Sequence, residues 1–321
     1  MEGTATIEGD EGERRPWKQM DDRRRRHLSH ESTSLFCSLA LLLSIRFAAA
    51  KGFARQRQPT TENHVPSNFT NFPQKMASRI AQIRLVSSHP QVYEPCDDSF
   101  ALVDALLADR KKLLDHRPTI CMEVGSGSGY VITSLALILQ EIKTAYYFAT
   151  DINLHAVRVT HETLEAHGVH AELLTTNIAA GLEKRLAGLV DVMVVNPPYV
   201  PTPEEEVGGD GIAAAWAGGE NGRSVIDKIL PIADNLLSEK GWLYMLFLAA
   251  NDPLQICLQM REKGYAAKII VQRATEEESL HVIKFWRDSD IRMEGNEAVT
   301  IAKNRGWEFL LSQLSRLSFR R

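Results

Sequence analysis

The sequence lacks closely spaced cysteines. Its four cysteines are tens of residues apart, at Cys37, Cys96, Cys121 and Cys257. Spacing this wide excludes the paired ligands of a common zinc site and the cysteine density of a small disulfide-stabilised scaffold. The ten histidines add no metal-ligand spacing. We therefore expect a protein with reduced thiols and no bound metal, located in the cytosol or the nucleus.

Long apolar runs are missing as well. A run near the N-terminus covers only residues 35–45 and is closed by Arg46, whereas a membrane-spanning helix needs about 20 apolar residues. Its flanks, four arginines at 23–26 and three alanines at 48–50, also fit the pattern of a signal peptide. Residues 1–75 as a whole show no period that would bury a face. We interpret them as a disordered or non-native leader, with an organelle-targeting presequence as the alternative.

The sequence has no excess of positive charge that would hold a phosphate backbone. The whole chain carries a formal net charge of -4 at pH 7. Residues 76–290 contain 19 Lys and Arg against 29 Asp and Glu, a net charge of -10. Because an acidic surface repels polyanions, the composition disfavours a nucleic-acid partner.

Hydrophobic periodicity predicts alternating helices and strands. Apolar residues recur at helical spacing over 99–114, which predicts an amphipathic helix before the first strand. The predicted strands are 119–124, 145–150, 171–175, 190–195, 242–248, 267–272 and 280–286. The helices predicted between them are 131–142, 154–166, 225–237 and 253–263.

This order predicts an α/β fold with a doubly wound, mostly parallel sheet of seven strands. The last two strands have no helix between them, so they should form a C-terminal antiparallel hairpin. We expect this domain to occupy residues 76–288, and the tail, 289–321, to contain a further helix.

The first chemical motif is a glycine-rich turn where the first strand gives way to a helix. It reads Glu123-Val124-Gly125-Ser126-Gly127-Ser128-Gly129. Glycines let the backbone turn tightly and let a ligand approach the main chain closely. The spacing is GxGxG with an acidic residue before it, so it favours S-adenosylmethionine over a pyrophosphate-bearing dinucleotide. The alternative is a glycine turn that only packs.

The second motif is Asp151, which follows the second predicted strand. A carboxylate at this point of an open α/β sheet accepts hydrogen bonds from ribose hydroxyls. An N-cap for the helix that begins near Asn153 is the alternative. Because Asp151 occurs together with the glycine turn, we favour the cofactor-binding role.

The third motif, Asn196-Pro197-Pro198-Tyr199, follows the fourth predicted strand. Two prolines fix the backbone and remove two donors, so the turn presents rigid carbonyl acceptors. A nitrogen with two hydrogens can donate one to the Asn196 side-chain oxygen and one to the Pro197 carbonyl, which leaves its lone pair facing a methyl group. Tyr199 would stack on the planar group attached to that nitrogen. The motif therefore predicts methylation of a planar nitrogen, with a strand-ending proline turn as the alternative.

Taken in this order, the three motifs resemble a class I methyltransferase. Two further segments narrow the resemblance, Val92-Tyr93-Glu94-Pro95-Cys96-Asp97-Asp98-Ser99-Phe100 and Ala215-Trp216-Ala217-Gly218-Gly219-Glu220-Asn221-Gly222-Arg223. They are similar to the eukaryotic HemK-like protein-glutamine methyltransferases, and the similarity covers about residues 83–286. Members methylate the glutamine amide of the Gly-Gly-Gln motif in class I translation termination factors.

The resemblance also implies roles for single residues. Those assigned to the cofactor are Ser99, Glu123, Gly125, Gly127, Asp151, Asn177, Ile178 and Asn196, with Asn196 also touching the substrate. Asn177 and Ile178 would lie beside the adenine ring, and Asn177 stands where the family usually has an aspartate. The resemblance further implies a heterodimer with a small zinc-binding activator subunit, which would cover the apolar edge at 171–175.

Other activities fit the same motifs. An adenine amino group in DNA, or an RNA base, also presents a planar NH₂, but the acidic composition and the lack of a basic recognition region count against it. Protein lysine would first need deprotonation, and the sequence offers no dedicated base. A cofactor-binding scaffold without activity is the alternative outside enzymes.

Overall fold

The computed structural model describes residues 79–209, 212–274 and 279–288, together with Ser312. The expectations for the leader, for the turn between the last two strands and for a helix in the C-terminal tail lie outside these residues.

In the described part of the chain, seven strands form one sheet in the order β3-β2-β1-β4-β5-β7-β6. They are β1 (Ile120–Val124), β2 (Tyr146–Asp151), β3 (Glu172–Thr175), β4 (Val190–Val195), β5 (Leu237–Leu248), β6 (Tyr265–Ala274) and β7 (Ser279–Arg287). Strands β1 to β5 pair in parallel, and β7 is antiparallel to both β5 and β6. The predicted fold class is confirmed, although β5 begins five residues earlier than expected.

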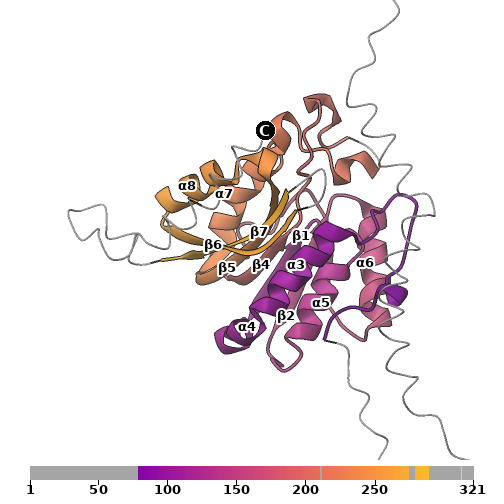
Figure 1. The fold of residues 1–321 in the computed structure, drawn as a ribbon. Coiled ribbons are helices and arrows are strands. Elements are labelled where there is room, and N and C mark those ends of the chain that lie inside the picture. Colours follow the sequence, from indigo (N-terminus) through magenta and orange to yellow (C-terminus); the bar gives the residue numbers. More distant parts are fainter. Residues whose placement is uncertain (1–78, 210–211, 275–278, 289–311, 313–321) are drawn as a thin grey trace, which may run out of the picture. The chain divides into compact units, whose positions relative to one another are not determined.

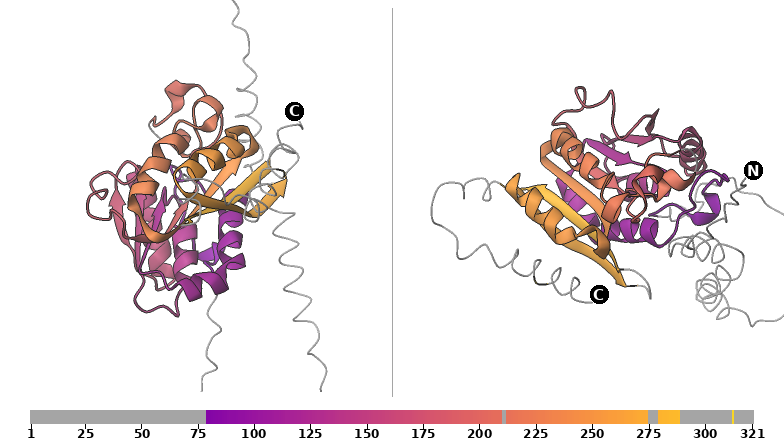
Figure 2. Two further views of the ribbon diagram at one scale, coloured as in Figure 1. Left: turned by 90° about the vertical axis from the view of Figure 1, so that its left-hand side faces the viewer. Right: turned by 90° about the horizontal axis from the view of Figure 1, so that it is seen from above.

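Helices cover both faces of this sheet (Figures 1 and 2). They are α3 (Asp97–Ala108), α4 (Arg110–His116), α5 (Tyr130–Ile138), α6 (Leu154–Ala166), α7 (Ile226–Leu236) and α8 (Pro253–Glu262). Figure 1 shows α3, α5 and α6 side by side on one face, with α7 and α8 on the other. A helix between two strands carries the chain back along the sheet, so the next strand can run parallel to the last.

The single helix predicted over 99–114 is wrong, because the structure ends α3 at Ala108 and starts α4 at Arg110. The break falls at Asp109, whose side chain points into the core. One carboxylate oxygen accepts from Tyr244 Oη at 3.0 Å and from Lys284 Nζ at 3.1 Å. Both partners come from strands far along the chain, so helical periodicity could not reveal the break. Helix α5 also ends four residues earlier than expected, where the chain turns toward β2.

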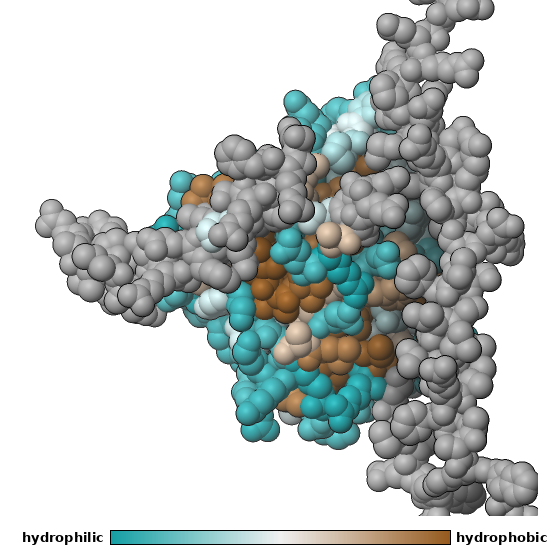
Figure 3. Space-filling view, in the orientation of Figure 1, coloured by the Kyte–Doolittle hydropathy of each residue, from teal (hydrophilic) through white to brown (hydrophobic). Residues whose placement is uncertain are grey.

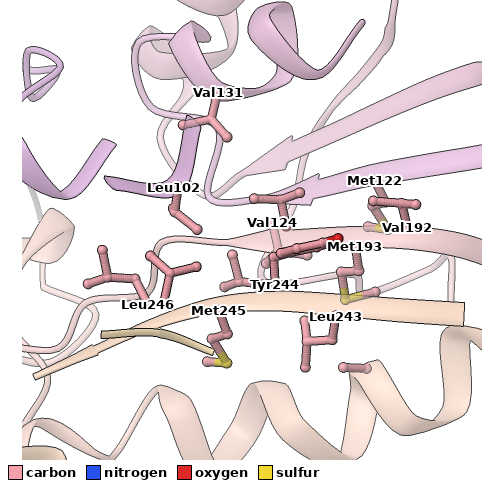
Figure 4. Close-up of a cluster of buried hydrophobic side chains, with 14 of the residues drawn as sticks. Leu102, Met122, Val124, Val131, Val192, Met193, Leu243, Tyr244, Met245 and Leu246 are labelled. Atoms are coloured by element: carbon pink, nitrogen blue, oxygen red, sulfur yellow. The ribbon is translucent and has the colours of Figure 1, made fainter. Parts of the chain in front are cut away.

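The core lies between the sheet and the two helical layers. All six residues of β4 are buried, as expected for a central parallel strand that is covered on both faces. Figure 4 shows Leu102 and Val131 reaching the sheet from one helical layer, while Leu243 and Met245 point toward the other. This packing makes the central strands a rigid support for the loops at their carboxyl ends.

The helical face seen in Figure 1 is mixed in polarity. Polar side chains surround apolar patches over the region of α3 and α5 (Figure 3). Among the described residues, no helix has the length and apolar character needed to cross a membrane.

Candidate active site

The predicted site residues meet at one edge of the sheet because the strands that carry them are parallel. Val124 at the end of β1 is in register with Thr150 of β2 and with Val195 of β4. Asp151 at the end of β2 is in register with Thr175 of β3. The loops after β1, β2, β3 and β4 therefore leave the sheet side by side, which is where open α/β sheets bind ligands.

The glycine-rich turn has a left-handed backbone at each glycine. The φ angles are +78° at Gly125, +51° at Gly127 and +75° at Gly129, a region in which other residues are strained. A Cβ on Gly129 would lie 2.7 Å from Thr160 Cα of α6, whereas a Cβ on Gly127 would meet nothing within 4 Å. Gly129 thus permits close helix packing, and Gly127 borders open space.

Asp151 fixes this turn. Its Oδ2 accepts a hydrogen bond from the Gly127 amide at 2.8 Å, and its Oδ1 accepts one from the Asn153 amide at 2.8 Å. Burial raises the pKa of Asp151, and these backbone donors oppose the rise. The N-cap of α6 is Asn153, which accepts from the His155 amide, so the alternative of Asp151 as the cap is excluded. Each carboxylate oxygen keeps a second lone pair for another donor.

Glu123 lies beneath the turn. Its side chain is 1% exposed, and its Oε2 accepts from the Ile132 amide in the first turn of α5 at 2.8 Å. Burial raises the pKa of Glu123 well above its usual value, partly opposed by this backbone donor. Within the protein its role is to join β1 to α5, and contact with a cofactor stays a prediction.

The Asn-Pro-Pro-Tyr turn is bound to the start of α3 through Asp98, which the sequence analysis names only as a member of the segment 92–100. Asp98 Oδ2 accepts from Asn196 Nδ2 at 3.0 Å and from Tyr199 Oη at 3.1 Å. Asp98 and Tyr199 are each only 9% exposed. In the sequence, Asp98 could have been singled out because it lies in the segment 92–100 that carries the family resemblance. The spacing of that segment does not show which residues Asp98 contacts.

This contact sets the direction of the Asn196 amide. Because Nδ2 faces the Asp98 carboxylate, Oδ1 faces the other way. Oδ1 is buried and has no hydrogen-bond partner among the residues that the structure describes. A buried acceptor without a partner is costly unless a ligand satisfies it. The site therefore contains a fixed acceptor that a donor from outside the chain can use.

Ser99 belongs to the same cluster. Its hydroxyl donates to Asp98 Oδ1 at 3.1 Å, and Cys96 Sγ donates to the same oxygen at 3.0 Å. Burial, followed by the charge of Asp98, raises the pKa of the Cys96 thiol, so this sulfur stays protonated. The structure thus brings Ser99 close to Asn196 through their common partner Asp98.

Asn177 and Ile178 lie just beyond the end of β3. Asn177 is exposed, and the Ile178 carbonyl accepts from Thr150 Oγ1 at 2.6 Å. Ile178 has a φ of +53°, a left-handed conformation that is strained for a β-branched residue and that gathers at functional sites. This segment therefore lies beside the end of β2, as the predicted adenine site requires.

The two segments that carry the resemblance meet at this turn. Val200 pairs with the second segment, donating its amide to the Trp216 carbonyl at 3.0 Å and accepting from the Gly218 amide at 2.9 Å. The Trp216 ring lies 6.2 Å from the ring of Tyr93 in the first segment. Segments more than 100 residues apart thus contact each other beside the Asn-Pro-Pro-Tyr turn.

Fold and site together define a class I methyltransferase. Residues 88–215 match the family model described as "Methyltransferase small domain". The chain is 44% identical over 196 residues to "Methyltransferase HEMK2" of Homo sapiens, covering 61% of this chain and 90% of the human protein. It is 32% identical over 219 residues to "eRF1 methyltransferase catalytic subunit mtq2" of Schizosaccharomyces pombe, covering 64% of this chain and 94% of that protein.

A solved structure of the E. cuniculi Mtq2-Trm112 complex, described as responsible for methylation of the eRF1 translation termination factor, is also similar. It shares 28% identity, covers 62% of this chain and 99% of that chain, and has a TM-score of 0.44. The similarity of this chain to the human and fission yeast proteins shows that it belongs to the eukaryotic HemK-like class I methyltransferases.

Proposed function

We propose that this methyltransferase transfers a methyl group from S-adenosylmethionine to the glutamine side-chain amide of the Gly-Gly-Gln motif in a class I translation termination factor. The observation that carries the proposal is the buried Oδ1 of Asn196, which faces away from Asp98 and has no hydrogen-bond partner in the described part of the chain. A primary amide offers the planar NH₂ that this acceptor fits. The Schizosaccharomyces pombe relative, named for eRF1, supports the same class of substrate.

The residues at the sheet edge fit the cofactor. Open space beside Gly127 admits close approach to the main chain, and Asp151 keeps lone pairs for ribose hydroxyls. Asn177 and Ile178 would flank the adenine, and Ser99, Gly125 and the buried Glu123 would complete the pocket. When bound, S-adenosylmethionine supplies an electrophilic methyl group on its sulfonium.

The chain's own residues would orient the target amide. Asn196 Oδ1 accepts one N–H and the Pro197 carbonyl accepts the other, so the nitrogen lone pair faces the methyl donor. As positive charge develops on the nitrogen, both acceptors stabilise it without reorganising, because Asp98 fixes Asn196 and the prolines fix the backbone. The predicted stacking of the target on Tyr199 would use the small part of this side chain that stays exposed.

Labelling of purified proteins tests this function. With tritiated S-adenosylmethionine, the full chain and its activator subunit should label a class I release factor, and should not label a release factor whose Gly-Gly-Gln glutamine is replaced by asparagine. Asn196→Ala should lower the rate at least about 1,000-fold, because one fixed group of an oxyanion hole is worth about 100- to 1,000-fold and Asn196 also orients the target. Its cofactor affinity by calorimetry should fall far less than its rate, because the other residues of the cofactor pocket are unchanged. Labelling of DNA, or of a lysine, in place of the glutamine would contradict the proposal.

We also propose that a small zinc-binding activator subunit covers the β3 edge of the sheet. β3 is the terminal strand, and its Leu173 and Leu174 are only half-buried. Tyr146, at the start of the neighbouring strand, is 66% exposed. An apolar edge strand invites pairing with another chain. The relative named a "catalytic subunit" supports an assembly of this kind.

Substitution at this edge tests the partner. Tyr146→Glu should weaken binding of the activator at least about tenfold, because it places a charge in an apolar contact, and titration calorimetry measures the change. Leu258→Glu is the matched control, since Leu258 on α8 is also exposed, at 40%, but lies away from β3. Equal binding by both variants would exclude this edge as the interface.

A further inference from the structure

The Asn-Pro-Pro-Tyr turn cannot be held through amides of its own prolines. Pro197 and Pro198 have no N–H, so the turn depends on contacts made by side chains and carbonyls. Asp98 supplies one such contact through Asn196 and Tyr199. The opposite end of the turn, the Tyr199 carbonyl, needs a separate donor.

That donor is Asn251, in the 3₁₀ turn η5 (Ala249–Asn251) that follows β5. Its side chain is fully buried, with 0% exposure. Nδ2 donates to the Tyr199 carbonyl at 2.8 Å and to the Asn221 carbonyl at 2.9 Å, while Oδ1 accepts from the Leu248 amide at 2.7 Å. Both hydrogens of the amide are therefore used, and each binds a different segment.

Gly222 packs tightly against the Asn251 amide and the Tyr199 carbonyl. A Cβ on Gly222 would lie 1.9 Å from the Tyr199 carbonyl oxygen and 2.5 Å from Asn251 Nδ2. Gly222 has a φ of +68° and Asn221 a φ of +54°, so both adopt left-handed backbone where the loop turns onto the site. The Asn251 side chain is thus the meeting point of three segments: the Asn-Pro-Pro-Tyr turn, η4 (Glu220–Gly222) and the end of β5.

Tyr199 is consequently held at both ends. Its hydroxyl donates to Asp98 Oδ2, the same oxygen that receives Asn196 Nδ2, and its carbonyl accepts from Asn251. A shift of the carbonyl would move the hydroxyl or break its contact, and would disturb the oxygen that orients Asn196. Asn251 is thus mechanically linked to the acceptor atoms, although it need not touch a substrate.

We propose that Asn251 is a positioning residue for methyl transfer. By holding the Tyr199 carbonyl, it keeps Asn196 Oδ1 and the Pro197 carbonyl at the spacing that accepts both N–H groups of the target amide. The inference rests on the proposed function of this turn. A displacement of about 1 Å is enough to cost roughly 100-fold in rate when geometry alone carries catalysis.

Two substitutions separate positioning from simple burial. Asn251→Ala removes the Nδ2 group that donates to the carbonyls of Tyr199 and Asn221. Asn251→Asp preserves size and the acceptor for Leu248, but a carboxylate cannot donate to the carbonyls of Tyr199 and Asn221. Asn235→Ala is the control for loss of an amide-to-carbonyl hydrogen bond, because the exposed Asn235 donates from Nδ2 to the Glu183 carbonyl at 3.1 Å, away from the turn.

The experiment uses the full chain with its activator, and rates are divided by the folded fraction at the assay temperature. For both Asn251 variants, kcat on the release factor should fall about 30- to 100-fold, with KM and cofactor affinity within about threefold. Hydrogen exchange followed by mass spectrometry should show faster exchange at the amides of Val200 and Gly218, with α5 unchanged. Asn235→Ala should match the parent in kcat.

A normalised kcat within threefold of the parent, or unchanged exchange at Val200 and Gly218, would overturn the proposal. Loss of fold in both variants would assign Asn251 to stability alone and would overturn it too. Failure of the proposed function can be told apart from failure of the positioning role, because in that case the parent protein itself would leave the release factor unlabelled. The exchange comparison would then still decide whether Asn251 holds the turn.

Discussion

A single carboxylate oxygen binds two side chains of the Asn-Pro-Pro-Tyr turn. Asp98 Oδ2 receives both Asn196 Nδ2 and Tyr199 Oη, and hydrogen bonds to a charged acceptor are stronger than neutral ones. An amide could rotate by 180° at little cost in a neutral site, because its oxygen and nitrogen have nearly the same shape. The charge of Asp98 removes that freedom, so the Asn196 oxygen faces away from Asp98, where the proposed target amide would bind.

Replacing this charge tests the arrangement. Asp98→Asn should lower kcat about 10- to 100-fold, because the new amide can donate as well as accept and each lost charge-assisted hydrogen bond is worth about 1.5–3 kcal/mol. Steady-state kinetics on the release factor measures the effect. Asp97→Asn is the control, since Asp97 is the exposed neighbour on the same helical turn, and it should retain parental activity. An Asp98→Asn enzyme within twofold of the parent would show that orientation of Asn196 has another cause.

In the turn between β1 and α5, glycines that look alike in the sequence have different structural roles. Gly129 lies against the backbone of Thr160, where α5 and α6 pack closely, whereas Gly127 borders open space. Both have positive φ angles. The motif alone could not show which glycine serves helix packing and which serves ligand binding, because this depends on the position of α6 in the folded chain.

Alanine at each position separates the two tasks. Gly129→Ala should reduce the free energy of unfolding by roughly 2–5 kcal/mol, from left-handed strain and a contact with backbone that cannot move aside. Gly127→Ala should cost only about 1–2 kcal/mol of strain, but should weaken cofactor binding at least about tenfold. Urea unfolding and calorimetry measure the two quantities. Equal losses of stability would contradict the assignment of Gly127 to the open side.

Across the whole domain, β7 carries polar groups into the core. Lys284 is 5% exposed; its Nζ lies 3.1 Å from Asp109 Oδ2 and 3.1 Å from the centre of the Trp242 ring. Burial lowers the pKa of Lys284, and Asp109 opposes the fall. This contact joins the antiparallel half of the sheet to the break between α3 and α4. His281, on the same strand, is 0% exposed.

We expect stability to depend on pH through His281. Burial lowers its pKa from 6.5 to about 4, so between these values the unfolded chain binds more protons than the folded chain. The free energy of unfolding should therefore fall as pH drops through this window, by about 1.4 kcal/mol per pH unit and about 3 kcal/mol in all.

His281→Gln should lose this contribution. Urea unfolding of the parent and the variant at pH 7, 6 and 5 measures it, and the difference between them cancels the opposite effect of Glu123, whose raised pKa weakens the fold as pH rises. The stability of the parent relative to the variant should fall as pH drops. Parallel curves would show that His281 does not titrate as its burial requires.

Local patterns in the chain were enough to establish the order of strands and helices, because hydrophobic periodicity is local and the helices between strands force a parallel sheet. The family resemblance implied that Gly125, Asp151 and Asn196 share a cofactor site, and the structure places them at one edge of the sheet because parallel strands end together. Features that depend on contacts between distant segments emerged only from the folded chain. The first helix is broken at Asp109 by partners on β5 and β7, and Asn196 takes its direction from Asp98. The Tyr199 carbonyl is bound to Asn251, a contact that no spacing along the chain could specify.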